Sequence, residues 1–298
     1  MKNFDVSIYG NLILDTVHCV SFFSHGHSNE SISQYKSVGA IGNVIREFKR
    51  IDEKLKIFVH SSVGDDDEGS SIIFSLNKFG IEHKINIDND NPTSNAVIIS
   101  DISLNKRTSI VRWGACTESS FSDLYNSRWH HIMYLDTLTN LTESDLIKIS
   151  NNGIVSADLC LNDYSQERKN WVVSMLKYID YLIISDEEAK SLMSQNNNTV
   201  WRSYCDEEAA LFLGKKVKNC CIIHTPHGST ASDGQTVNTF TTKFHYNKNL
   251  NVLGAGDVFA SSFISSTLSG KNLVDSIEYA HTNTSNRIKI RGNENEKI

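Results

Sequence analysis

Strand-like and helix-like segments alternate along most of this 298-residue chain, and this alternation restricts the fold more than any other feature. Short apolar runs give way to stretches with helical spacing, and these give way to new apolar runs. The expected strands are residues 4–9, 56–60, 154–157, 181–184 and 221–224. The expected helices cover about 44–55, 72–79, 166–175 and 187–193. Repeated units of this kind predict an α/β fold whose central sheet is mostly parallel and covered by helices.

Two stretches interrupt this alternation. Residues 12–35 are polar, with Phe22 and Phe23 among Ser and His residues, and residues 95–113 have the pattern of a hairpin around a turn at 101–105. Strands inserted into an α/β sheet often form a flap over the ligand crevice. We therefore expect a small β-lid from about residues 12–36 and 94–114. Because no Pro/Gly/Ser-rich linker separates the halves, a single domain over 1–298 is favoured over two.

Composition excludes several classes of protein. The net charge is −6 and the two signs are interspersed, which argues against nucleic acid as a partner. No apolar run approaches the length that crosses a bilayer, so no membrane partner is expected. The first residues do not resemble a signal peptide, and the six scattered cysteines suggest no disulfide framework. We expect a cytoplasmic protein with reduced thiols.

A short glycine turn near the C-terminus contains the most chemically suggestive residues. Gly254, Ala255 and Gly256 are followed by Asp257 and then by a helical pattern. Such a turn leaves backbone N–H groups open to an anion at a helix N-terminus. A carboxylate beside the anion can take a proton from an attacking hydroxyl while the N–H groups stabilise phosphoryl oxygens. Taken alone, the motif is better read as a tight turn in which Asp257 only complements the helix dipole.

Two further motifs lie near the N-terminus. Asp15 follows the first strand and its Gly10, where a carboxylate can accept hydrogen bonds from vicinal hydroxyls. By itself it also fits a solvated loop. Gly39 and Asn43 precede a helix expected to begin at Val44, and the simplest interpretation makes Asn43 the N-cap of that helix.

Ser185 and Glu188 form a third motif. They follow an apolar run with the spacing of a capping box, and this structural reading accounts for both residues. A functional reading places Glu188 near Mg²⁺ through a bound water, because Mg²⁺ keeps several waters beside nucleotide phosphates.

In their order and spacing these motifs, together with a Val-Gly-x-Asp-x-x-Gly segment near residue 65, resemble those of the ribokinase-type sugar kinases, the PfkB carbohydrate kinases. The resemblance covers nearly the whole chain. It implies a three-layer α/β/α ribokinase-like fold with a small β-lid. It also implies an ATP-dependent kinase that uses Mg²⁺ and phosphorylates a hydroxyl of a sugar or sugar-like small molecule.

The resemblance also implies roles for individual residues. Asp257 matches the catalytic base, and Gly254, Ala255 and Gly256 match the anion hole. The positions implied on the substrate side are Asp15, Gly39, Asn43, Arg107 in the lid hairpin and, more weakly, Asp136. The positions implied on the nucleotide side are Ser185, Thr225, His227, Gly228 and His281, with Glu188 as the acid near Mg²⁺.

Several positions depart from the family pattern. Asn251 and Val252 replace an Asp and a Thr before the glycine turn, so we do not expect strong activation by a monovalent cation. Val38 replaces the first glycine of a pair and reshapes the substrate side. Ser185 replaces an Asn in the Mg²⁺ element. These departures keep a non-catalytic sugar- or nucleotide-binding protein open as an alternative.

A nucleoside kinase of the same fold is the nearest alternative within the class, because Phe22, Phe23 and Trp113 could provide a stacking wall. A homodimer through the lid is a further expectation, since exposed strand edges invite pairing.

Overall fold

The computed structural model describes residues 3–104, 106–119, 121, 125–160, 165–194, 205–242 and 253–291. The chain divides into two compact units. Unit 1 consists of Met1–Gly10, Leu55–His60 and Ser119–Lys243, and unit 2 consists of Asn11–Lys54, Ser61–Glu118 and Phe244–Ile298. The single domain over 1–298 stays a prediction.

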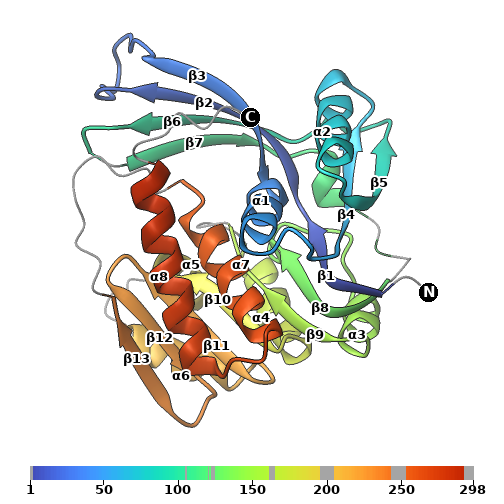
Figure 1. Cartoon of the computed structure of the whole chain (residues 1–298), viewed down its shortest axis with the longest axis vertical. Coiled ribbons are helices and arrows are strands. Elements are labelled where there is room, and N and C mark those ends of the chain that lie inside the picture. Colours follow the sequence, from blue (N-terminus) through green and yellow to red (C-terminus); the bar gives the residue numbers. More distant parts are fainter. Residues whose placement is uncertain are drawn as a thin grey trace. The chain divides into compact units, whose positions relative to one another are not determined.

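Unit 1 contains most of the central sheet, labelled in Figure 1. Its strands are β1 (Asn3–Gly10), β4 (Ile57–Gly64, whose last four residues belong to unit 2), β8 (Asn126–Met133), β9 (Ile154–Ala157), β10 (Tyr181–Ser185), β11 (Cys220–Thr225), β12 (Gly228–Ser232) and β13 (Val237–Thr241). The hydrogen-bonded order is β13-β12-β11-β10-β9-β8-β1-β4, and β5 (Glu82–Asp88) of unit 2 follows β4. Pairs from β4 to β11 are parallel, whereas β11, β12 and β13 pair antiparallel. The predicted, mostly parallel sheet is confirmed.

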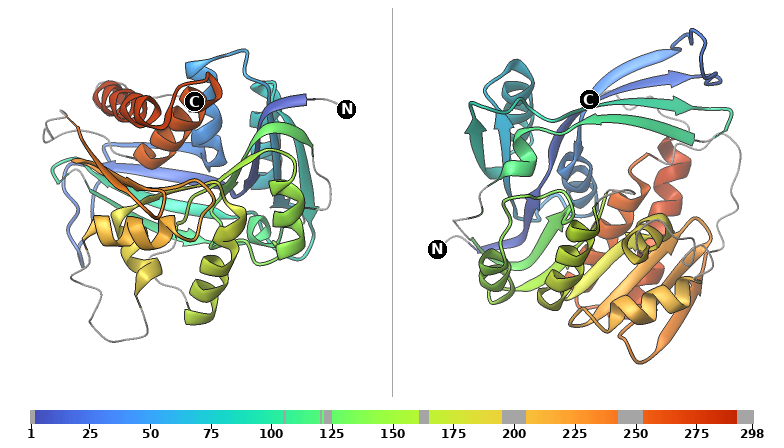
Figure 2. Two further views of the ribbon diagram at one scale, coloured as in Figure 1. Left: turned by 90° about the horizontal axis from the view of Figure 1, so that it is seen from below. Right: turned by 180° about the vertical axis from the view of Figure 1, so that it is seen from behind.

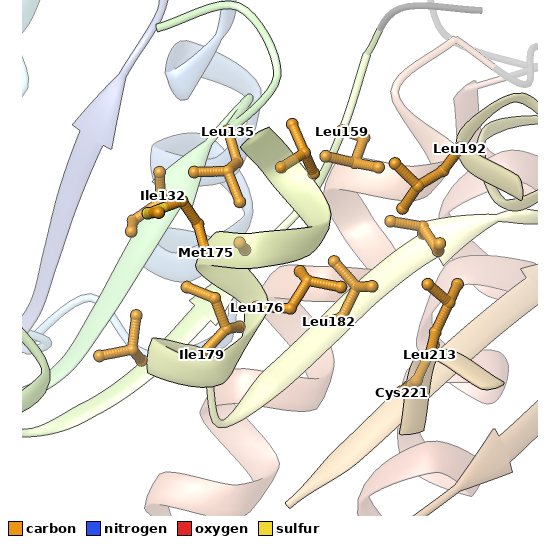
Figure 3. Packing of buried hydrophobic residues seen from close by; sticks show 14 of the residues in the cluster. Ile132, Leu135, Leu159, Met175, Leu176, Ile179, Leu182, Leu192, Leu213 and Cys221 are labelled. Carbon is orange, nitrogen blue, oxygen red and sulfur yellow. The ribbon is translucent and has the colours of Figure 1, made fainter. Parts of the chain in front are cut away.

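The helices of unit 1 pack their apolar faces against this sheet. They are α3 (Glu143–Ser150), α4 (Gln166–Met175), α5 (Asp186–Met193) and α6 (Asp206–Gly214), with a 3-10 turn η2 (Leu176–Tyr178). Figure 3 shows the resulting core, in which side chains from the strands meet side chains from α4, α5 and α6. The labelled members include Ile132, Leu182 and Cys221 on strands and Met175 and Leu213 on helices. Cys221 is fully buried here and acts as a small hydrophobic residue.

Unit 2 contains a second, smaller sheet in the order β3-β2-β6-β7, which lies in blue and green in Figures 1 and 2. Its strands are β2 (Leu12–Val20), β3 (Ser33–Ala40), β6 (Asn95–Asp101) and β7 (Lys106–Arg112). Strands β2 and β6 pair parallel, and the other two pairs are antiparallel. These strands fall in the two segments proposed for the lid, although β3 continues to Ala40. The polar stretch 12–35 therefore contains strands that are joined by a turn.

The helices of unit 2 are α1 (Ile41–Ile51), α2 (Asp67–Lys78), α7 (Ala255–Leu268) and α8 (Leu273–Arg291), with a 3-10 turn η1 (Ala115–Glu118). Helix α7 packs against both α1 and α8. Helix α1 begins three residues earlier than expected because β3 runs into it without a loop. Of the described helices, none is long and apolar enough to cross a membrane.

Candidate active site

Helix α7 begins at the predicted glycine turn. Gly254 is its N-cap and has a φ of 70°, in the left-handed region that glycine adopts without steric cost. Asp257 lies in the first turn of α7, and only 8% of its surface is exposed. The first N–H groups of a helix lack intrahelical partners and carry the positive end of its dipole. The turn from Gly254 to Gly256 can therefore receive an anionic group beside the Asp257 carboxylate.

Asn43 holds the Asp257 carboxylate. Its Nδ2 donates a hydrogen bond of 2.7 Å to Asp257 Oδ2. The prediction that Asn43 is an N-cap is wrong, because Ala40 occupies that position with a φ of 48° and makes no side-chain cap. Asn43 is instead the third residue of α1. Its side chain is free of a capping role and reaches α7.

Asp15 lies on β2, with 7% of its surface exposed, so its reading as a solvated loop residue is wrong. A Cβ at Gly39 would be 2.2 Å from Asp15 Oδ2. The Asp15 carboxylate thus packs against the Gly39 backbone, and any larger residue there would displace it. Asp15 and Gly39 therefore lie together, and their role on the substrate side stays a prediction.

Asp15 lies in a charge environment that includes Asp257. Burial, followed by the negative charge of Asp257, raises the pKa of Asp15 to about 7, although Arg46 and Arg107 act in the opposite direction. A carboxylate in a poorly solvated place beside a second carboxylate resists ionisation. Strongly perturbed acids of this kind gather at functional sites.

Arg107 lies on the same face of the small sheet as Asp15. Asp15 is in register with Ala96, and Arg107 is in register with Ser100, four residues further along β6. Because alternate residues of a strand share a face, Asp15 and Arg107 point to the same side. Arg107 is exposed there.

Arg46 belongs to this group, although the sequence analysis did not identify it. Its Nη2 donates to Asn43 Oδ1, and its charge lowers the pKa of Asp15. The one signal in the sequence is its position three residues after Asn43, on the same side of a helix. That spacing is common in helices and does not by itself mark a site.

His281 lies on α8, where its ring meets the Phe259 ring of α7 edge-on at a centroid distance of 5.0 Å. Burial lowers the pKa of His281 to about 4, so the ring is neutral at physiological pH. The structure thus gives it a packing role in unit 2. Its proximity to an adenine stays a prediction.

The predicted capping box at the start of α5 is confirmed. Ser185 Oγ accepts from the Glu188 N–H at 3.2 Å, and Glu188 Oε2 accepts from the Ser185 N–H at 2.7 Å. The box fixes the Glu188 carboxylate at the N-terminus of α5, at the end of β10. Its role toward Mg²⁺ stays a prediction.

The two-residue turn between β11 and β12 contains His227 and is flanked by Thr225 and Gly228. Thr225 Oγ1 donates to the Gly228 carbonyl at 3.2 Å and accepts from the His227 N–H at 3.1 Å. A Cβ at Gly228 would be 2.0 Å from the Phe240 carbonyl oxygen of β13, so only glycine fits there. The side chain of His227 is exposed.

Asp136 is buried in unit 1, and its contacts there stabilise the chain after β8. Its carboxylate accepts from the Cys160 N–H at 3.1 and 3.2 Å. The Arg168 guanidinium donates to the Asp136 carbonyl oxygen at 2.9 Å. The substrate-side role suggested for Asp136 stays a prediction. Asn251 and Val252 lie outside the described residues.

A cavity of about 590 Å³ in unit 1 contains none of the predicted site residues. It lies between α4, α5 and α6 and is lined in part by Lys169, Lys177, Lys215 and Lys216. Lys169 donates to Ser194, Lys177 pairs with Glu143, and Lys216 lies over the Phe212 ring. Because three of its four lysines are engaged by the protein itself, we do not assign this cavity to a phosphate group.

The amino-acid sequence matches the model of the pfkB family carbohydrate kinases over residues 3–292. The match spans nearly the entire chain, and the protein therefore belongs to the PfkB carbohydrate kinase family. A search of curated protein sequences gives no match.

Solved structures of ribokinase-family proteins are similar to this chain. A nucleoside kinase from Methanocaldococcus jannaschii is 19% identical with a TM-score of 0.73, over 97% of this chain and 92% of that one. A ribokinase from Thermotoga maritima is 21% identical with a TM-score of 0.72, over 96% and 93%. An adenosine kinase from Schistosoma mansoni is 15% identical with a TM-score of 0.74, over 95% and 94%. At these identities the likeness shows the fold, and the predicted ribokinase-like α/β fold is confirmed.

Proposed function

We propose that this protein transfers the γ-phosphoryl group of ATP to a hydroxyl of a sugar or sugar-like small molecule. Family membership supports a phosphotransferase, and ribokinase-family kinases use ATP. One observation on this chain supports the proposal most directly. The buried Asp257 carboxylate stands in the first turn of α7 directly after the left-handed Gly254, and Asn43 holds it in place.

Asp257 is the proposed base. Its carboxylate accepts the proton of the attacking hydroxyl as the new O–P bond forms. The N–H groups of Gly254, Ala255 and Gly256 form the proposed anion hole, in which they stabilise charge on the transferred oxygens. The hydrogen bond from Asn43 to Asp257 Oδ2 fixes the orientation of this carboxylate.

Asp15, Gly39, Asn43 and Arg107 form the proposed acceptor side. Ionised Asp15 accepts hydrogen bonds from hydroxyls of the substrate, and the absence of a side chain at Gly39 leaves room for the Asp15 carboxylate. Asp136 is kept as a weaker proposal for this side.

The proposed nucleotide side uses Ser185, Thr225, His227, Gly228 and His281. ATP supplies the phosphoryl group, and Mg²⁺ bound to it neutralises phosphate charge. The described residues contain no cluster of three or more His, Cys, Asp or Glu that could hold a metal ion. Mg²⁺ is usually held by one or two carboxylates, waters and the nucleotide phosphates. Glu188 is the proposed acid near this ion.

A nucleoside is the second candidate acceptor. Phe22 is 57% exposed in unit 2, close in sequence to Phe23, whose N–H donates to Asp101 at 2.8 Å. An exposed aromatic side chain on an anchored segment can stack on a base. A screen of ATP consumption over sugars and nucleosides distinguishes the two candidates.

We also propose a homodimer through the small sheet. Val97 and Ile110 are cross-strand neighbours with 42% and 67% of their surfaces exposed. They lie on the face opposite to that of Asp15, which pairs with Ala96. Apolar residues exposed on a sheet favour association.

The substitution Asp257→Asn tests the role of the base. We expect kcat to fall by about 10²- to 10⁴-fold, since a positioned base contributes this much to a proton transfer. The matched control is Asp275→Asn, which alters an exposed acid in the first turn of α8. Steady-state ATP turnover and thermal unfolding are measured for both variants. Unchanged turnover in Asp257→Asn contradicts the proposal. Tight sugar binding without turnover of any alcohol by the wild type indicates a non-catalytic binding protein instead.

A further inference from the structure

Arg46 lies beside the proposed acceptor side without belonging to any motif of the sequence. We propose that Arg46 is a positioning residue that orients Asn43 toward Asp257 and supplies the anchored positive charge next to Asp15. This inference rests on the function proposed above for Asp257.

The backbone of α1 directs Arg46 toward the site. In a helix, long side chains point back toward the N-terminus, so Arg46 extends over the preceding turn. A Cβ at Gly42 would be 2.8 Å from Val38 and 3.5 Å from Arg46 Nη1. The Arg46 guanidinium therefore lies within van der Waals range of Gly42, on the turn that precedes it.

The guanidinium determines which way the Asn43 carboxamide points. A carboxamide presents an acceptor on one side and donors on the other, whereas a guanidinium only donates. Arg46 Nη2 donates to Asn43 Oδ1, and Asn43 Nδ2 is thereby left for Asp257 Oδ2 at 2.7 Å. A flipped amide would place two oxygen atoms against each other. Arg46 therefore stabilises the one orientation that supports the proposed base.

The same guanidinium compensates the two carboxylates. The charged groups around Asp15 are Asp257 on α7, Arg46 on α1 and Arg107 on β7. The cross-strand neighbours of Asp15, which are Ser37 and Ala96, carry no charge. Arg107 is exposed and more strongly screened by salt, whereas Arg46 is half-buried. Removal of Arg46 is therefore expected to favour the protonated form of Asp15.

Three variants separate these effects. Arg46→Met removes the charge and the donors, and Arg46→Lys keeps the charge without the planar fork. Arg50→Met is the matched control on the same helix, because Arg50 contacts Glu47 and Asn283 and lies outside the proposed site. Each variant is assayed for kcat, for KM and for the pH dependence of kcat/KM with the accepted alcohol.

For Arg46→Met we expect kcat to fall about 10- to 100-fold, because small displacements of a reacting group have effects of this size. The rising limb of kcat/KM moves to higher pH, since Asp15 ionises later. Arg46→Lys returns the limb toward the wild-type pH but does not restore kcat. Arg50→Met leaves the pH limb and kcat unchanged. A wild-type kcat and an unshifted limb in Arg46→Met overturn the inference.

A measurement without catalysis keeps this inference distinguishable from the proposed function. Asp15→Asn is combined with Arg46→Met in a double-mutant cycle of urea unfolding at pH 8. We expect Asp15→Asn to raise the folding equilibrium constant by about tenfold more in the Arg46→Met background than in the wild type, and the two effects to converge at pH 4. If the wild type turns over no alcohol, the proposed function fails, and this coupling still tests the charge of Arg46. If the effects of the two substitutions on stability are additive at pH 8, the inference about the charge of Arg46 is overturned.

Discussion

Two buried acids of unit 2, Glu47 and Asp15, differ in the charged and hydrogen-bonding groups that surround them. Glu47 lies on α1 with 1% of its surface exposed. Arg50 Nη2 contacts it at 2.5 Å, Asn283 donates to it at 2.6 Å, and Arg287 Nε lies 3.3 Å away. Asp15 is similarly buried, but its neighbours include a second carboxylate, that of Asp257.

The two acids therefore differ in their capacity to accept hydrogen bonds from a ligand. A carboxylate surrounded by donors has its hydrogen-bonding capacity used within the protein and links elements, here α1 and α8. A carboxylate paired with another acid is held at a cost that a hydrogen bond donated by a bound hydroxyl can offset. We therefore expect Glu47 to serve the framework and propose Asp15 as part of the site.

The largest effect is expected from Glu47→Leu. This change leaves Arg287, whose side chain is only 12% exposed, without its anion. Breaking a buried ion pair on one side destabilises by about 3–5 kcal/mol. Urea unfolding at pH 7 measures the loss, and Glu53→Leu at an exposed position serves as control. A loss similar to that of the control would remove the framework role of Glu47.

Asp15→Asn is expected to have the opposite sign. Between pH 4 and 7 the folded protein holds a proton on Asp15 that the unfolded chain has released, because the pKa of Asp15 is raised to about 7. Ionisation of Asp15 therefore lowers stability as pH rises through this window and is fully unfavourable above it. At pH 8 the substitution should stabilise the protein by about 4 kcal/mol, and at pH 4 it should be neutral.

Urea unfolding of Asp15→Asn at several pH values, together with ATP turnover, tests this sign. We expect a more stable protein at pH 8 with impaired turnover, which is the usual relation between stability and a functional site. Equal destabilisation at both pH values would make Asp15 a framework residue like Glu47.

The smallest effect is expected at Ala40, which joins the strand of Gly39 to the helix of Glu47. Its φ of 48° is unfavourable for a residue with a Cβ. Ala40→Gly should stabilise the protein by about 1 kcal/mol, because relief of about 1–3 kcal/mol of strain exceeds the entropy cost of glycine. Thermal unfolding measures the change, and Ala209→Gly within α6 should be destabilising. A destabilised Ala40→Gly would show that its backbone is not strained.

Local features of the sequence predicted much of the fold. The expected strand at 154–157 and the helix at 166–175 match β9 and α4, and the capping box at Ser185 is present. The prediction at Asn43 failed because α1 begins three residues earlier than expected, with Ala40 at the N-cap and a φ of 48° there. Its residue type gives Asn43 a preference for N-cap positions. In the folded protein it lies inside α1 instead and donates a hydrogen bond to Asp257 on α7.

The sequence by itself determined the alternation of strands and helices, the glycine turn before α7 and the order of motifs that indicates the PfkB family. These depend on contacts within a few residues or on a pattern along the chain. Only the tertiary structure decided which acids share a charge environment, because the pKa of Asp15 on β2 depends on neighbours from α1, β7 and α7. The Asn43–Asp257 hydrogen bond spans 214 positions, and no local pattern encodes it. The position of Arg46 beside Asn43 and Asp15 likewise depends on the tertiary structure.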